Sequence, residues 1–266
     1  MLSTDYEERI SEQDLEKIQK LRLMDDFFMK LVFEGNIQAT ELVVNIVLNR
    51  SDLKVKKVVG QREIKGLEGH GVRLDIMAQD HENQAHDIEV ERQDGDWLRL
   101  RARYNSSMMD MVLLPEGEDY KKLIPSYVIF ITEHDRIGDG RPLHHYVMKD
   151  KSTRENLGDG RHIIFVNGDN ANEKTRLGKL VHDFKCSSPD DMYYKVLANG
   201  VRRFKETEGG RGEMSSVLEE ITVGAVIDSC RKLGVSEDRI FEHIVEDYGL
   251  TEERARKYMN ARKKSA

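Results

Sequence analysis

The sequence predicts a mixed α/β domain followed by a helical C-terminal appendage, and three observations lead to this fold class. Alternating apolar and polar residues at 72–79 and 85–92, separated by a polar gap, predict a β-hairpin. The continuous apolar run at 126–132 is typical of a strand that is buried on both faces. Beyond residue 167 the strand patterns stop and helical periodicity follows, so helices are expected after the sheet.

The segment before the hairpin predicts two helices and a strand. Residues 1–20 are polar and predict no more than a frayed helix. A short helix is expected to begin at Asp25 or Asp26 and to stop at the Gly-Asn pair that follows it. The helical period repeats over 38–49, and the run KVKKVVGQREI then predicts a strand that leads through the glycine-rich turn KGLEGHG into the hairpin.

A long helix is expected after the hairpin, followed by strands and then by helices. Its apolar face is predicted from residues that recur at three- and four-residue steps between 97 and 114, namely Leu100, Tyr104, Met108 and Met111. Further strands are predicted at 126–132, 144–150 and 161–167, and further helices at 174–184, at 190–206 and, as three short helices, over 213–264. The stretch ETEGGRGE at 206–213 predicts a linker.

Composition limits the class of protein. The chain has 266 residues, of which 38% are hydrophobic and 34% charged, a length between one large domain and two ordinary domains. Its net charge of −7 argues against a generally basic nucleic-acid coating protein, although a local basic patch can still bind nucleic acid. Cys186 and Cys230 have no metal-ligand spacing, so a reducing cytoplasm is expected. No apolar leader segment and no apolar run of about 18 residues is present, so neither a signal peptide nor a membrane association is expected.

Acidic residues gather on one face of the predicted hairpin. Alternate side chains of a strand share a face, and the polar gap centres the reversal between residues 82 and 83, so Asp75 is expected beside Glu89 and Glu91. Like charges that lie opposite each other destabilise a sheet, and a hard cation such as Mg²⁺, which prefers carboxylate oxygens, relieves the repulsion. The pattern therefore predicts a metal site. The same alternation also describes a hairpin with one solvated face, and the pattern alone leaves both interpretations open.

The spacing of these acidic residues resembles the core motif of the PD-(D/E)XK nucleases. Several runs in the same order are similar to the PD-(D/E)XK nuclease family transposases, which are related to the recombination-promoting nucleases of bacteria: MDDFFMKLVF, GVRLDI, HDIEVERQ, RARYNSS, GEDYKKLIPSYVIFITEHD, HIIFVNGD and LVHDFKCSSPDDMYY. The resemblance covers about residues 22–206, a nuclease-like domain, and only weakly the helical C-terminal region over 207–266. A polar N-terminal segment over 1–21 precedes the domain.

The resemblance implies a restriction-endonuclease-like fold, a mixed β-sheet flanked by helices, and Mg²⁺- or Mn²⁺-dependent hydrolysis of DNA phosphodiester bonds. Asp75 matches the metal-binding aspartate on the second core strand, and Glu89 matches the acidic residue on the third. Glu91 stands where the superfamily has a lysine and this family usually has a glutamine. A glutamate supplies no positive charge, so Glu91 is expected to act as a third ligand or a general base. Gln93 is expected on the same strand face, where it covers part of the missing role.

Accessory residues flank this motif. Asp26 resembles a recurrent acidic position in the first helix of the family. Arg99, Arg101 and Arg103 cluster near the start of the helix after the hairpin and are candidates for phosphate contacts. A solvated helix face that balances nearby acids is the alternative interpretation of these arginines.

Three hypotheses of function follow. The first is a metal-dependent DNA endonuclease linked to recombination, mobile elements or defence, with DNA as its partner. Cutting both strands usually calls for two active sites, so a homodimer is the expected assembly in that case. The second is a catalytically degenerate nuclease fold that binds DNA or a protein partner, because Glu91 replaces the usual lysine or glutamine. The third is an interaction protein whose helical tail over 213–264 is the working part.

Overall fold

The computed structural model describes residues 10–64, 71–93 and 95–263. They form two compact units, one over Lys20–Arg203 and one that combines the described residues before 20 with those after 203. Residues 1–9 of the polar N-terminal segment and most of the glycine-rich turn, at 65–70, lie outside the described residues.

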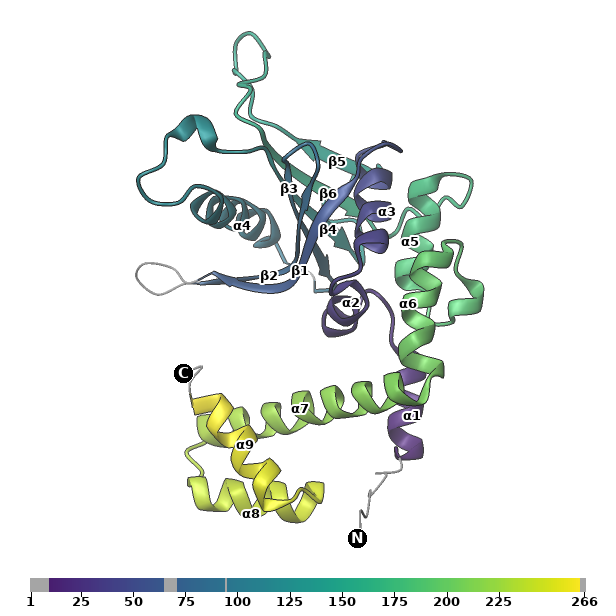
Figure 1. The fold of residues 1–266 in the computed structure, drawn as a ribbon, viewed down its shortest axis with the longest axis vertical. Helices are drawn as coiled ribbons and strands as arrows, with labels where there is room; N and C mark the ends of the chain where they lie inside the picture. The colour runs from purple at the N-terminus through teal and green to yellow at the C-terminus, as the bar shows by residue number, and fades with distance from the viewer. Residues whose placement is uncertain (1–9, 65–70, 94, 264–266) are drawn as a thin grey trace. The chain divides into compact units, whose positions relative to one another are not determined.

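The larger unit is an α/β domain (Figure 1). Its elements in chain order are α2 (Asp26–Phe33), α3 (Ile37–Val47), β1 (Val55–Ile64), β2 (Val72–Asp80), β3 (Ala85–Glu91), α4 (Leu98–Leu113), η1 (Tyr120–Lys122), β4 (Ser126–Thr132), β5 (Leu143–Tyr146), β6 (Arg161–Asn167), α5 (Arg176–Lys185), η2 (Pro189–Asp191) and α6 (Lys195–Glu206), whose last turn lies in the smaller unit.

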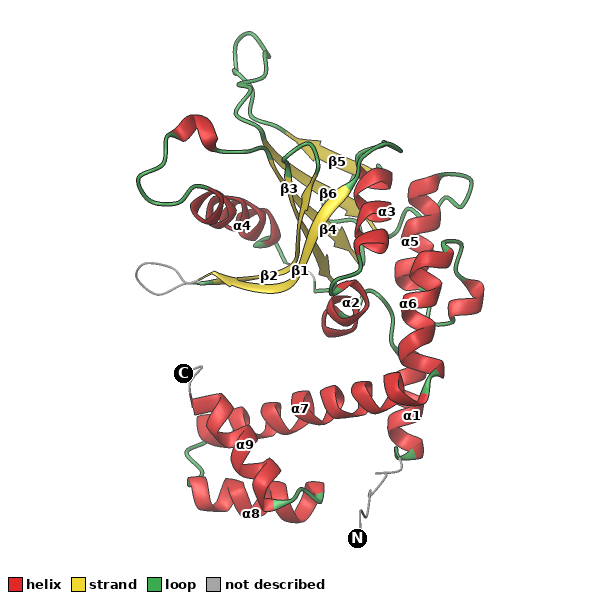
Figure 2. Cartoon of the chain, in the orientation of Figure 1, coloured by secondary structure: helices red, strands yellow, loops and turns green. Residues whose placement is uncertain are grey.

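The described residues form one six-stranded sheet with the order β1-β2-β3-β4-β6-β5. The first three strands are antiparallel, β3, β4 and β6 run parallel, and β5 returns antiparallel to β6. Helix α4 covers one face, while α3 and α5 lie on the other side (Figures 1 and 2). The expected mixed sheet flanked by helices is therefore confirmed.

The packing of α4 differs from the prediction. Leu98, Ala102 and Met109 are buried and pack on strand residues such as Phe130. Of the predicted apolar face only Met108 is buried, whereas the other residues are among the exposed large hydrophobic side chains: Leu100, Tyr104 and Met111. The buried stripe contains polar residues, Asn105 and Ser106, so the period of the apolar residues alone predicts the wrong side of the helix.

The smaller unit consists of α1 (Glu12–Lys20, whose last residue falls in the larger unit), α7 (Glu208–Lys232), α8 (Glu237–Tyr248) and α9 (Glu252–Lys263), together with the end of α6. The predicted linker at 206–213 is wrong, because α7 begins at Glu208 and runs through the glycines. Thr207 caps this helix by accepting a hydrogen bond from the backbone N–H of Gly210 at 3.1 Å. Gly249 has a φ of 63° and ends α8 in the left-handed region.

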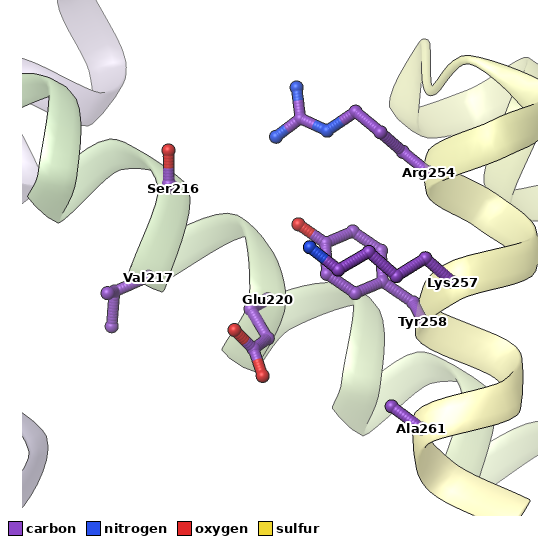
Figure 3. A pocket seen from close by; sticks show the side chains of 7 residues that line it. All are labelled: Ser216, Val217, Glu220, Arg254, Lys257, Tyr258 and Ala261. Atoms are coloured by element: carbon purple, nitrogen blue, oxygen red, sulfur yellow. The ribbon is translucent and has the colours of Figure 1, made fainter.

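An apolar core holds α7, α8 and α9 together, and a small cavity of about 270 Å³ lies between α7 and α9. Its lining includes Arg254 and Tyr258 from α9, opposite Glu220 of α7 (Figure 3). The Tyr258 hydroxyl donates to Glu219 Oε1 at 2.9 Å, and Arg254 Nη2 lies 2.8 Å from the same oxygen, so polar contacts bridge the two helices beside this gap. None of the helices in the described part of the chain has the length and apolar character needed to cross a membrane.

Candidate active site

The β2–β3 hairpin brings acidic side chains from two strands together. The register pairs Ile76 with Ile88 and Met77 with Asp87, which places Asp75 opposite Glu89. The reversal is centred on residue 82 itself, not between 82 and 83. Asn83 adopts a left-handed φ of 63°, which fits a turn with an odd number of residues. The register is therefore shifted by one position from the predicted one. The predicted sharing of one face nevertheless holds.

These acidic side chains are buried. Asp75 is 3% exposed, Asp87 and Glu89 are 0% exposed, and Glu91 is 7% exposed. The solvated-face interpretation of the hairpin is therefore wrong, because α4 covers this face of β3. A buried carboxylate is costly unless it is paired and hydrogen-bonded, so its neighbours decide what the cluster can do.

Helix α2 supplies a cation to Asp75. Lys30 Nζ lies 2.9 Å from Asp75 Oδ1 and 2.7 Å from Asp26 Oδ2, so the structure joins Asp26 to the cluster through a shared lysine. The other carboxylate oxygen of Asp75, Oδ2, is buried and has no hydrogen-bond partner among the described residues. This oxygen is free to accept a ligand.

Helix α4 supplies the partners of the β3 acids. Arg101 Nη1 donates to Glu91 Oε2 at 2.9 Å, and Arg101 Nη2 donates to Glu89 Oε2. Asn105 Nδ2 donates to Glu89 Oε1 at 3.2 Å, and the backbone N–H of Asp75 donates to the same oxygen at 3.3 Å. Glu89 is thus held from the helix and from the neighbouring strand.

Burial and mutual repulsion shift the ionisation of the cluster. Burial, followed by the charges of Glu89 and Asp26, raises the pKa of Asp75 to about 8. Burial, followed by the charge of Asp87, raises the pKa of Glu89 to about 8, although Arg101 opposes the change. Burial also raises the pKa of Asp87 well above its ordinary value. Burial lowers the pKa of Lys30, but its acidic partners outweigh this effect and the net shift is upward.

Several predicted site residues lie elsewhere. Successive odd positions of a helix are about 200° apart, so Arg101 turns toward the sheet while Arg99 and Arg103 are exposed. The expectation that Gln93 shares the strand face is wrong, because β3 ends at Glu91 and Gln93 is exposed in the following bend. Only the backbone N–H of Gln93 reaches the cluster, donating to Glu91 Oε1 at 2.7 Å.

Three members of the cluster were not predicted, although the sequence carries signals for them. Asp87 follows from the alternation that selected Glu89, because it lies two residues earlier on the same strand. Lys30 stands four residues after Asp26 on α2, and Asn105 four residues after Arg101 on α4. Side chains with this spacing share a helix face, which identifies both as candidates.

The carboxylate oxygens of the cluster suit a hard divalent cation, although they do not form a complete set of ligands in the described part of the chain. Within the described residues, no group of three or more His, Cys, Asp or Glu side chains is arranged to hold a metal ion. Lys30 and Arg101 contact the carboxylates from which such a group would be built. Asp75 and Glu89 nevertheless offer carboxylate oxygens from adjacent strands, and Asp75 Oδ2 is unpartnered. Carboxylate oxygens are the ligands that Mg²⁺ prefers, so these residues fit the ion that the resemblance implies.

Comparison with known proteins agrees with the geometry. No curated protein and no solved structure matches the chain significantly. The order and pairing of the strands, with helices on both sides, are consistent with the expected restriction-endonuclease-like fold. The family described as PD-(D/E)XK nuclease family transposase matches residues 23–183, a segment that holds the whole carboxylate cluster and more than half of the chain, and the protein belongs to this family.

Proposed function

We propose that the protein is a Mg²⁺- or Mn²⁺-dependent endonuclease that hydrolyses DNA phosphodiester bonds, with Asp75 and Glu89 as the metal ligands. One observation carries the proposal: these two buried carboxylates lie opposite each other on adjacent strands, and Asp75 Oδ2 has no partner among the described residues. A divalent ion held by such carboxylates supplies an activated water and charge relief at phosphorus.

Other residues of the chain support this chemistry. Asn105 and the backbone N–H of Asp75 fix the orientation of Glu89. Both oxygens of Glu91 accept hydrogen bonds, from Arg101 and from the backbone of Gln93, which favours an anchoring role over that of a general base. Position 91 has no positive charge in this chain. We propose that Lys30, whose ammonium group reaches the same cluster from α2, supplies that charge instead. It stands where it can stabilise negative charge that develops on a phosphate.

The test is a nicking assay on supercoiled plasmid with titrated Mg²⁺ or Mn²⁺. The neutral variants Asp75→Asn and Glu89→Gln are compared with Glu116→Gln, which removes an exposed carboxylate from a loop. Substitutions outside the ligands themselves already cost about 10- to 100-fold, so each ligand variant is expected to lose at least about 100-fold in rate. Glu116→Gln is expected to retain full activity. Undiminished nicking by both ligand variants would refute the assignment.

A second candidate is a nuclease fold that binds DNA or a protein partner without cutting it. It is favoured by one observation, that Lys30 and Arg101 already neutralise part of the cluster that a metal would neutralise. The plasmid assay separates the candidates, because this one predicts a gel shift without metal-dependent nicking. A role in recombination, mobile elements or defence, and a homodimeric assembly, belong to the first proposal.

A further inference from the structure

A pocket of about 310 Å³ opens on the α4 face of the sheet, away from the carboxylates. Arg99 of α4, Tyr146 of β5 and two residues of β6, Ile163 and Phe165, line it. We propose that this pocket binds an unpaired nucleobase of the DNA substrate, so that the protein prefers DNA with an unpaired or extruded nucleotide beside the scissile phosphate. The inference rests on the proposed function, because it names the substrate class of that site.

The strand register fixes the position of the pocket relative to the carboxylates. Glu89 pairs with Phe130 across β3 and β4, and Phe130 pairs with Phe165 across β4 and β6. Directly paired residues share a sheet face, and neighbouring strands are about 4.8 Å apart. The floor of the pocket therefore lies about 10 Å from Glu89 on the same face, a distance that a short run of nucleotides spans.

A continuous row of contacts joins the two sites. The Arg101 guanidinium, which pairs with Glu89, lies 5.3 Å from the centre of the Phe130 ring. The rings of Phe130 and Phe165 stack with centres 5.9 Å apart, and Tyr146 meets Phe165 edge-on at 6.0 Å. The row passes from a buried end at the carboxylates to an accessible end, where Tyr146 is 46% exposed.

The chemistry of the pocket favours a base over an apolar side chain of a partner protein. Bases stack on aromatic rings and on arginine planes, and Tyr146 with Arg99 offers both. Arg99 and Arg103 stand four residues apart on α4, and both are exposed, so positive charge flanks the opening where phosphates would pass. A paired base is enclosed in the duplex, and only an unpaired or extruded nucleotide can enter such a pocket.

The test measures binding in the absence of divalent metal, so that no cleavage is required. Fluorescence polarisation compares a fully paired duplex, a duplex with one unpaired nucleotide, and the same duplex with an abasic residue at that position. One stacked base contributes about 5- to 150-fold in affinity. The parent protein is expected to show a preference of this size for the unpaired nucleotide, and to lose it with the abasic residue.

Three variants complete the design. Tyr146→Ala is expected to abolish the preference for the unpaired nucleotide, and Tyr146→Phe is expected to keep it. Tyr120→Ala, which removes a ring that is 85% exposed on η1, serves as the matched control. Equal affinity of the parent for all three duplexes, or an unchanged preference in Tyr146→Ala, would overturn the inference. The result does not depend on nicking, so failure of the nuclease proposal is detected separately in the plasmid assay.

Discussion

Replacing Asp75 by asparagine is expected to stabilise the metal-free protein at alkaline pH. The pKa of Asp75 rises from 3.8 to about 8 in the folded protein. Between these values the folded state holds a proton that the unfolded chain has released, so the stability of the parent falls as the pH rises from about 4 to about 8. At about 1.4 kcal/mol per pKa unit, the full loss is about 6 kcal/mol.

An asparagine side chain has nearly the same shape as the protonated aspartate and does not ionise. The variant therefore escapes the loss at pH 8 and gains nothing at pH 4.5, where the parent carboxyl is already protonated. The asparagine amide does not reproduce every contact of the protonated carboxyl, and this difference offsets part of the benefit. We expect a net gain of at least about 2 kcal/mol in the free energy of unfolding at pH 8. For a unit of this size the gain corresponds to a rise in melting temperature of about 4–8 °C.

Trp97 makes the measurement specific to the larger unit. It is the single tryptophan of the chain, at the N-terminus of α4, and its ring lies 6.0 Å from the Arg101 guanidinium. Thermal unfolding followed by its fluorescence in chelator, at pH 4.5 and at pH 8, reports the stability of the α/β domain. A variant that melts at or below the parent at pH 8 would show that Asp75 is a structural ion-pair partner. A gain that is the same at both pH values would show that it does not come from ionisation, and either result would refute the reasoning.

Two further predictions follow from the same structure. Lys30→Met is expected to lower the nicking rate by about 100-fold, since removal of one stabilising donor costs about 10²–10³ in rate, while calorimetry detects no loss of Mg²⁺ affinity. Lys151→Met, on an exposed loop, is the control, and full activity of Lys30→Met would contradict the charge role. Gly212→Ala is expected to stabilise α7 by about 0.5–1 kcal/mol, because nothing lies within 4 Å of the added Cβ and alanine is the better helix former. Unfolding followed by circular dichroism measures this gain, which a flexible linker would not show.

The parts of the fold that depend on local pattern were predictable. The apolar run at 126–132 is β4 with the predicted bounds, and the period-two alternation assigned the hairpin faces correctly. The helix that replaces the predicted linker over 206–213 was not predictable, because the glycines there favour a loop by propensity, whereas the cap at Thr207 and tertiary packing override this weak preference. The register of the hairpin depended on the backbone of Asn83, which the sequence does not specify.

Burial of the candidate site could not be predicted from the sequence, because it depends on how separate segments of the chain pack against each other. Alternation states which side chains share a face, but not whether a helix covers that face. Two polar residues on the inner side of α4, Asn105 and Arg101, donate hydrogen bonds to the acids of β3. The reason for polar residues on that side of the helix is therefore visible only when the helix is packed on the hairpin. Each segment alone resembles an ordinary amphipathic element.

The glutamate at position 91 has to be considered together with the charge balance of the whole cluster. The acids that converge here outnumber the cations that contact them: Asp26, Asp75, Asp87, Glu89 and Glu91 face Lys30 and Arg101 in the described part of the chain. A lysine at position 91 would reduce the excess negative charge and remove one of the two carboxylates that hold Arg101. Glutamate instead adds a charge that Arg101 pairs with, while burial, reinforced by the charges of Asp26, Asp87 and Glu89, raises the pKa values of Asp75 and Glu89. A divalent cation at Asp75 and Glu89, as proposed above, would relieve the excess negative charge, while Arg101 keeps Glu91 paired and Lys30 supplies an ammonium group beside Asp75.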